Sequence, residues 1–120
     1  FLKKEGIAHE KIKTIKDFLK IRINYAKKVG ISQIIIDPGM GHFVSSLPKY
    51  SFEIINRLKE LKTFRYPILL GISRKSFLGR ELLDRDKKAL PLTAIAVKHG
   101  ASIIRTHNVK ATVKLCQQCN

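Results

Sequence analysis

Apolar residues recur every three or four positions along residues 9–29, and this spacing predicts an amphipathic helix. The apolar face is formed by Ile12, Ile15, Leu19, Ile23 and Ala26. Lysines fill much of the opposite face. Gly30 follows directly and is typical of the position just beyond a helix end, because glycine adopts left-handed backbone angles without steric strain. We therefore expect the helix to end at Gly30.

Three short apolar runs predict three buried strands. They cover residues 34–36, 67–72 and 102–104. The first consists of three isoleucines, and a β-branched run without polar alternation is typical of a parallel strand that is buried on both faces. Each run is followed by a helical pattern, as in right-handed βα units. The sequence therefore predicts an α/β fold with about three parallel strands.

Further helical patterns alternate with these strands. They are expected over residues 48–61, in a short segment after residue 79, over 92–99 and over 110–118. Pro48 suits the first turn of its helix, and Gly100 suits the end of the helix before it. The charged residues 84–88 are expected to form a loop. The last helix is expected to bury Val113 and Cys116.

Polar residues follow each predicted strand at its carboxyl end. Asp37 follows the first strand, residues 73–75 follow the second, and Arg105 and His107 follow the third. The carboxyl ends of parallel strands share one edge, where a (β/α)8 barrel or a doubly wound sheet binds its ligand. A single aspartate after a strand is more often a turn former or a helix cap. The agreement of three strand ends nevertheless indicates a site.

The segment at residues 71–79 places an arginine, a lysine and two serines between a strand and a predicted helix. A helix N-terminus offers unpaired N–H groups, so such a turn is suited to holding an anion. Taken alone, the segment fits a solvated basic turn equally well.

The composition gives one domain of 120 residues with 24 Lys and Arg against 9 Asp and Glu, a net charge of +15. Such charge suits a nucleic-acid partner, but the lysines are spaced between apolar positions and are not gathered with aromatic residues. We therefore expect no nucleic-acid partner. No apolar run or signal peptide indicates a membrane, so we expect a soluble, cytoplasmic protein. Cys116 and Cys119 lack a second pair for zinc and are expected to be free thiols.

Three motifs, at residues 37–41, 71–76 and 100–109, resemble in order and spacing the last three strand motifs of dihydropteroate synthase. The resemblance implies a transferase of folate biosynthesis with one TIM (β/α)8 barrel and magnesium. In that reaction para-aminobenzoate displaces pyrophosphate from 6-hydroxymethyl-7,8-dihydropterin diphosphate and gives 7,8-dihydropteroate. Residues 1–120 would then be the C-terminal part of a single pterin-binding barrel domain.

The resemblance also implies roles for individual residues, with Lys75 and Arg105 as the catalytic pair. Asp37 resembles the carboxylate that binds the amino-pyrimidine edge of the pterin, and Lys75 resembles the lysine between the pterin and para-aminobenzoate. Ser76, with the helix N-terminus expected after it, would bind the benzoate carboxylate. Arg105 would pack along the pterin and, with His107, bind the diphosphate. The implied substrate-binding positions are Asp37, Gly41, Gly71, Ser73, Lys75, Ser76, Arg105 and His107.

The chain departs from the family pattern in two residues and in length. His42 stands where an aromatic residue is common, with Phe43 one place later, and Asn108 stands where aspartate is usual. A barrel needs about 250 residues, so we expect a longer protein whose missing N-terminal part holds the magnesium ligand. The chain also begins with Phe1 and not with Met. We expect these 120 residues alone to bind substrates poorly and to turn over little or nothing.

Two alternatives stay open at this point. One is the pterin-binding domain of a folate-dependent methyltransferase, which shares the aspartate and the barrel but does not usually carry the Ser-Arg-Lys-Ser turn. The other is a non-catalytic basic module that binds an acidic partner. The sequence leaves open whether the longer enzyme is a homodimer.

Overall fold

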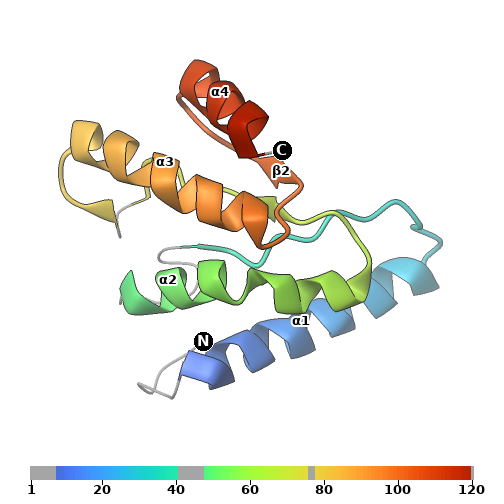
Figure 1. Cartoon of the computed structure of the whole chain (residues 1–120). Coiled ribbons are helices and arrows are strands. Elements are labelled where there is room, and N and C mark those ends of the chain that lie inside the picture. The colour runs from blue at the N-terminus through green and yellow to red at the C-terminus, as the bar shows by residue number, and fades with distance from the viewer. Residues whose placement is uncertain (1–7, 41–47, 76–77, 120) are drawn as a thin grey trace.

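The fold is seen in a computed structural model, which describes residues 8–40, 48–75 and 78–119 (Figure 1). Helices and short strands alternate along these residues. In chain order the elements are α1 (Ala8–Lys28), α2 (Pro48–Asn56), the 3-10 helix η2 (Leu58–Phe64), β1 (Leu69–Leu70), α3 (Leu82–Lys98), β2 (Ile103–Ile104) and α4 (Val109–Cys119). None of the described helices is both long and apolar enough to cross a membrane.

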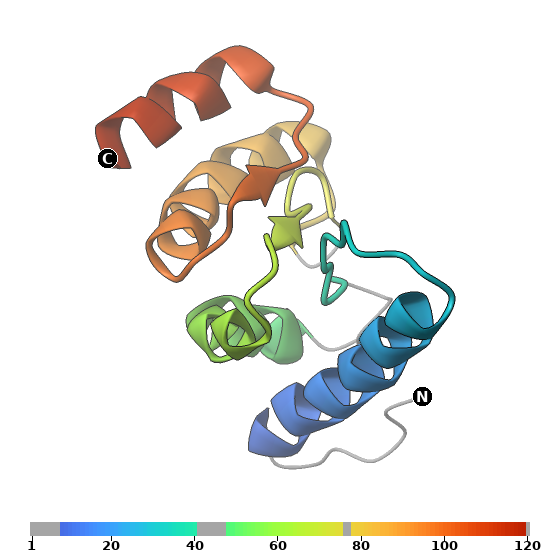
Figure 2. The same ribbon diagram turned by 90° about the vertical axis from the view of Figure 1, so that its right-hand side faces the viewer.

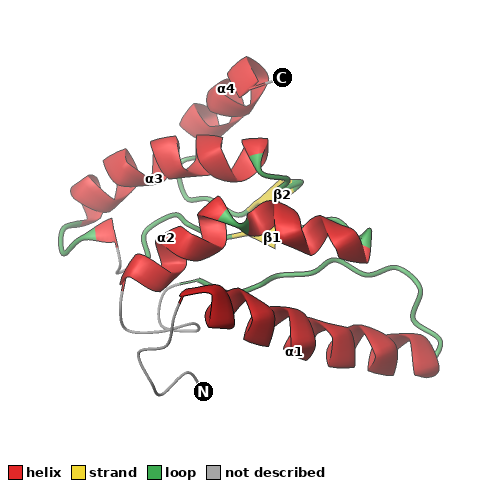
Figure 3. Ribbon diagram, turned by 60° about the horizontal axis from the view of Figure 1, so that its bottom comes forward, coloured by secondary structure: helices red, strands yellow, loops and turns green. Residues whose placement is uncertain are grey.

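The strands form a small parallel sheet. β1 and β2 pair with Leu70 opposite Ile104. On the other side of β1, Ile36 joins through an isolated parallel bridge to Ile68. Figure 3 shows how short the two strands are beside the helices. The predicted α/β class with three parallel segments is confirmed, although the regular strands are shorter than the apolar runs.

The helices lie next to one another in chain order, α1 against α2, α2 against α3 and α3 against α4. The helices form an arc, and the parallel segments lie on its inner side (Figure 2). This arrangement leaves the carboxyl ends of all three parallel segments at one edge, as expected for successive βα units.

The core is packed between α1, α2 and the parallel segments. The predicted apolar face of α1 is confirmed, because its four isoleucine and leucine positions are all buried. The largest fully buried side chains elsewhere include Tyr50, Ile54, Leu58, Leu61, Ile68, Leu70 and Ile72. Burying each leucine or isoleucine is worth about 1.5–3 kcal/mol relative to exposure, so this cluster holds the helices to the sheet.

Two glycines end helices in the same way, as predicted. Gly30 has φ of 90° and donates to the carbonyl of Lys27, while the next amide donates to the carbonyl of Ala26. Gly100 has φ of 112° and donates to the carbonyl of Val97, and the following amide donates to Ala96. These paired bonds satisfy carbonyls that a helix end leaves open. At each glycine the chain therefore leaves the helix and enters the apolar segment that follows.

The first predicted strand is not buried on both faces. Ile36 is 3% exposed and lies in the core, whereas Ile35 is 55% exposed. Successive side chains of an extended segment point to opposite sides, and none of the described residues covers the side of Ile35. The prediction was wrong because an apolar run indicates that its side chains are suited to burial, but it does not identify the residues that would cover them.

The helix predicted over residues 48–61 is divided at Arg57. α2 ends at Asn56, and the chain continues as the 3-10 helix η2. In a 3-10 helix residues three apart lie in line, which places Leu58 and Leu61 together in the core. Arg57 and Glu60, also three apart, form a hydrogen-bonded ion pair on the outer side.

The charged loop predicted at residues 84–88 is instead part of α3. This helix starts at Leu82, and residues 79–81 before it are not helical. Ala89, Thr93 and Ala96 form its buried face at helical spacing, and Thr93 donates to the Ala89 carbonyl at 2.7 Å. Lysine, arginine and leucine are good helix formers, so this charged stretch continues the helix on its solvent side.

α4 also differs from the prediction in its buried face. Val113 is 50% exposed and Cys116 is half-buried, while Thr112 is buried. The Thr112 hydroxyl donates to the Asn108 carbonyl at 2.8 Å and lies 3.0 Å from the Thr106 hydroxyl. These bonds make the Thr112 side of α4 the buried side. The pattern of apolar residues could not predict this, because the bonds are made by polar side chains and a backbone carbonyl.

Candidate functional site

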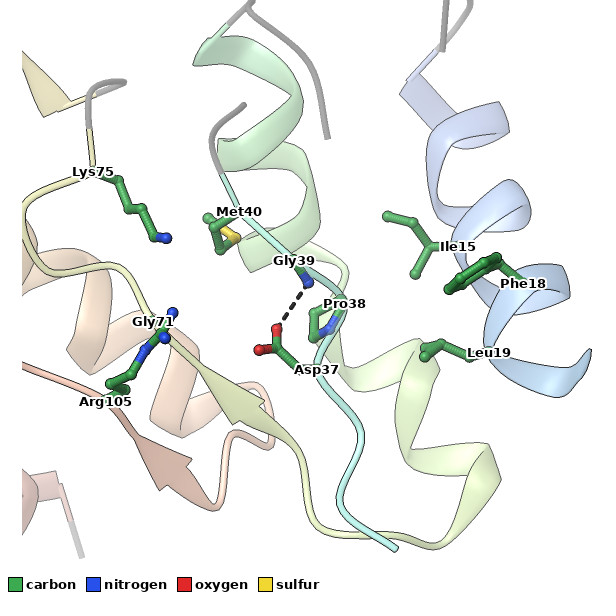
Figure 4. Close-up of a pocket in the computed structure, with 10 residues that line it drawn as sticks. All are labelled: Ile15, Phe18, Leu19, Asp37, Pro38, Gly39, Met40, Gly71, Lys75 and Arg105. Carbon is green, nitrogen blue, oxygen red and sulfur yellow. Dashed lines mark hydrogen bonds between the residues drawn. The ribbon is translucent and has the colours of Figure 1, made fainter. Parts of the chain in front are cut away.

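The carboxyl ends of the three parallel segments open into a cavity of about 560 Å³ (Figure 4). Asp37 follows the first segment, Gly71 and Lys75 follow β1, and Arg105 follows β2, and all four line this cavity. The sequence predicted that Asp37, Lys75 and Arg105 share one edge of the sheet, and their convergence is confirmed. The wall therefore combines one carboxylate with two cations.

The opposite wall of the cavity is apolar and was not predicted. It consists of Ile15, Phe18 and Leu19 of α1 with Pro38 and Met40 of the loop after the first segment. Met40 is 2% exposed, whereas Phe18 is 52% exposed. The sequence carried one signal, since Phe18 lies three positions after Ile15 and so belongs to the edge of the same helical face.

Asp37 both forms a turn and lines the cavity. One carboxylate oxygen, Oδ1, accepts a hydrogen bond from the Gly39 amide at 2.9 Å. Gly39 has φ of 80°, which suits this tight turn. The second carboxylate oxygen makes no hydrogen bond with the residues that the structure describes. One oxygen thus fixes the loop and the other is available to a ligand donor.

A second cavity of about 420 Å³ shares three residues with the first. Gly71, Lys75 and Arg105 line both, and Ser73 and His107 line the second one. The Ser73 hydroxyl lies 3.0 Å from Nδ1 of His107 and accepts the His107 amide hydrogen at 3.1 Å. These contacts join the ends of β1 and β2. The polar residues predicted after both strands are therefore brought together.

Arg74 is tied to α3 by its own side chain. Its guanidinium contacts Asp86, with Nε 3.1 Å from Oδ1 and Nη2 3.4 Å from Oδ2. Arg85 donates to the carbonyls of Arg74 and Gly79 at 3.2 and 2.6 Å. Arg74 has φ of 58°, a left-handed conformation that is uncommon for a residue with a side chain. The charged residues of α3 thus hold the turn that presents Lys75.

α3 does not directly follow this turn, because it begins at Leu82, seven residues after Lys75. Between them, among the described residues, only Leu78 is helical, in a 3-10 conformation. The benzoate-binding role of Ser76 stays a prediction. Ser76, Gly41, His42 and Phe43 lie outside the described residues.

Asn108, the unusual residue after His107, caps α4. Its side-chain oxygen accepts the Ala111 amide hydrogen at 3.2 Å, three positions into the helix. Asparagine and aspartate are equally good in this N-cap position. The substitution therefore preserves the start of α4.

Neither a metal centre nor a disulfide is found in the described part of the chain. No group of three or more His, Cys, Asp or Glu residues there could hold a metal ion. Cys116 and Cys119 are both free and half-buried. The magnesium implied by the resemblance therefore has no ligand cluster among the residues at this edge of the sheet.

Known proteins match most of the chain in sequence. Residues 2–107 match the family model described as pterin binding enzyme. The type-3 dihydropteroate synthase of Escherichia coli is 34% identical over 116 residues, which cover 91% of this chain and 44% of that enzyme. The dihydropteroate synthase of Synechocystis is 32% identical over 110 residues, covering 86% of this chain and 37% of that enzyme.

Solved structures give the same result. A Coxiella burnetii dihydropteroate synthase in complex with pteroic acid matches with a TM-score of 0.88 and 35% identity, over 96% of this chain and 44% of that one. The Anaplasma phagocytophilum enzyme with bound 6-hydroxymethylpterin-monophosphate matches with a TM-score of 0.89 and 30% identity, over 98% of this chain and 47% of that one. The chain spans less than half the length of these relatives.

These relatives confirm the resemblance to dihydropteroate synthase that the three motifs predicted, and they do not favour a methyltransferase domain. Sequence and structure agree over nearly the whole chain. The chain belongs to the pterin binding enzyme family.

Proposed function

We propose that this chain is part of a dihydropteroate synthase and carries one side of its pterin site. The observation that supports this most is the meeting of Asp37, Lys75 and Arg105 in one cavity after three parallel segments. The Coxiella burnetii relative, which matches 96% of the chain, was solved with pteroic acid. The three segments would be successive strands in the C-terminal part of a (β/α)8 barrel.

The larger cavity suits a flat heterocycle with hydrogen-bond donors on one edge. Its volume lies within the usual range for small-molecule sites, about 300–1,000 Å³. The free carboxylate oxygen of Asp37 would accept an N–H of the amino-pyrimidine edge, and a charged acceptor strengthens such a bond. Arg105 would lie along the ring, since a planar guanidinium packs well on aromatic faces.

The smaller cavity suits the leaving group. In the reaction, the amine nitrogen of para-aminobenzoate forms a bond to the pterin methylene carbon. The bond from that carbon to the diphosphate oxygen breaks, pyrophosphate takes the electron pair, and the amine loses a proton. Lys75 and Arg105 line both cavities, and His107 lines the smaller one. With the diphosphate in the smaller cavity, these residues would stabilise the negative charge that develops on it.

Magnesium, which the resemblance implies, has no fitting ligand group in the described residues, and we derive no step through it. Its ligands would belong to the part of a longer protein that these 120 residues do not include. The cytoplasmic location stays a prediction from the sequence, and whether the longer enzyme is a homodimer stays open.

The experiment that tests this function is a chimera. The segment of the Coxiella burnetii enzyme that this chain matches is replaced by the chain, and we call this protein the Coxiella chimera. We expect it to release pyrophosphate from the pterin diphosphate only when para-aminobenzoate is present. A folded chimera that binds the pterin diphosphate without this release would contradict the proposal.

A further inference from the structure

We propose that Gly71 is a positioning residue, because its missing side chain leaves the space in which the Arg105 guanidinium lies. A Cβ atom placed on Gly71 would be 2.7 Å from Nη2, 2.9 Å from Nε and 3.2 Å from Cζ of Arg105. Non-bonded heavy atoms prefer separations of about 3.5–4.0 Å. Any other residue at position 71 would therefore displace this guanidinium.

The strand register explains why these two residues meet. Leu70 lies opposite Ile104 in the parallel ladder, so Gly71 and Arg105 come next to each other where both strands end. The Arg105 amide donates to the Leu70 carbonyl at 3.0 Å, which fixes the backbone of Arg105. Its side chain then crosses Gly71, and Figure 4 shows the guanidinium directly against that glycine.

The conformation of Gly71 does not itself require glycine. The described glycines with positive φ are Gly30, Gly39, Gly79 and Gly100, and Gly71 is not among them. An alanine at position 71 would thus keep the backbone without strain. The close approach of Arg105 is the reason for glycine here.

Packing, not an ion pair, sets the place of this guanidinium. Within the described residues, Arg105 makes only the backbone hydrogen bond to Leu70. No carboxylate there lies within ion-pair distance of it. Gly71 therefore sets the position of the Arg105 guanidinium, which lines both cavities. The guanidinium N–H groups make no hydrogen bond with the described residues and can donate to a ligand. The consequence for catalysis rests on the proposed function, whereas the positioning itself does not.

The positioning is tested on the 120-residue chain by recording the ¹H–¹⁵N signals of the arginine Nε–H groups. In Gly71→Ala we expect the Arg105 signal, assigned with Arg105→Lys, to shift while those of Arg22 and Arg80 stay in place. An unchanged Arg105 signal overturns the proposal. If Gly71→Ala does not fold, adding Arg105→Ala should restore folding, because it removes the atoms that the new methyl group meets. A double variant that stays unfolded would also overturn it.

The catalytic consequence is tested in the Coxiella chimera. We expect Gly71→Ala to lower kcat/KM for pyrophosphate release about ten-fold, the size of one charged hydrogen bond. In an Arg105→Ala background the same change should cost less than about two-fold, because the residue that it displaces is gone. If Gly71→Ala lowered kcat/KM by the same factor with and without Arg105→Ala, the result would contradict a role of Gly71 in positioning Arg105. A chimera that is inactive without substitutions, together with a shifted Arg105 signal, would instead reject the proposed function and keep the positioning.

Discussion

Lys75 and Lys59 carry the same charge in different surroundings. Lys75 is half-buried and lines both cavities, whereas Lys59 is exposed on η2. A hydrogen bond to a charged group is worth about 1.5–3 kcal/mol, while a surface substitution usually changes stability by less than about 0.5 kcal/mol. Position, and not charge alone, should therefore decide what each lysine contributes.

In the Coxiella chimera we expect Lys75→Ala to lower the rate of pyrophosphate release by about ten- to a hundred-fold. Lys59→Ala removes the same charge and should leave the rate unchanged. Steady-state kinetics on both folded variants make the comparison. Equal, small effects would mean that the turn around Lys75 is a solvated loop and that the site is assigned wrongly.

The sequence was informative for residues that directly follow a strand. Asp37, Lys75 and Arg105 were found because carboxyl ends of parallel strands must meet. The sequence could not distinguish Arg74 from Lys75, since both are cations in one turn. Only the left-handed backbone of Arg74 and its contact with Asp86 show that Arg74 holds the turn and Lys75 lines the larger cavity.

The contact of α3 with the turn after β1 links the solvent-exposed side of this helix to the site. Asp86→Asn should weaken the ion pair with Arg74 and lower the rate of the Coxiella chimera by a few-fold, less than Lys75→Ala does. The effect on stability should stay below about 1 kcal/mol, because Arg74 is exposed. Asp84→Asn, at an exposed position of the same helix, is the matched control and should behave as the unsubstituted chimera. Identical kinetics for both variants would show that the contact between Asp86 and Arg74 does not hold the turn.

The Arg57–Glu60 ion pair, at the junction of α2 and η2, should make the stability of the fold depend on pH. The hydrogen bond from Arg57 lowers the pKa of Glu60 below its ordinary value of 4.5, and partial burial opposes this only in part. A lowered pKa in the folded state stabilises the fold above the ordinary pKa, and this contribution is lost as the pH falls through the folded value. Because Glu60 is partly exposed, the contribution should be below about 1 kcal/mol.

Urea unfolding of the chain and of Glu60→Gln at pH 7 and at pH 3 measures this contribution. The free energies of unfolding should differ at pH 7 and approach each other at pH 3. Glu81→Gln, at an exposed position with no ion pair among the described residues, serves as the control. A difference between wild type and Glu60→Gln that is the same at both pH values would contradict the assigned pKa shift.

Helices were easier to predict than strands, for a physical reason. The three-and-four spacing of α1 and the two glycine ends are local properties of the sequence. The start of α3 was missed because a run of charges fits a loop and the solvent side of a helix equally well. The inward turn of Thr112 in α4 depends on hydrogen bonds to the preceding loop, which no periodicity encodes.

The described residues form one side of the proposed ligand site. The polar groups lie at the carboxyl edge of three parallel segments, while Ile35 and part of the α1 surface, such as Phe18, are exposed. The relatives are more than twice as long as the matched region. What covers these apolar residues could not be predicted from the chain, because burial is a property of the complete fold.

We propose that this chain supplies part of the site at which para-aminobenzoate replaces pyrophosphate on the pterin. The most direct measurement supplies isotopically labelled para-aminobenzoate and the pterin diphosphate to the Coxiella chimera and identifies the product by mass spectrometry. We predict labelled 7,8-dihydropteroate, formed in equal amount to the pyrophosphate released, and slower formation of both in Asp37→Ala and Arg105→Ala. Pyrophosphate release without labelled product, or undiminished product in both variants, would contradict the account.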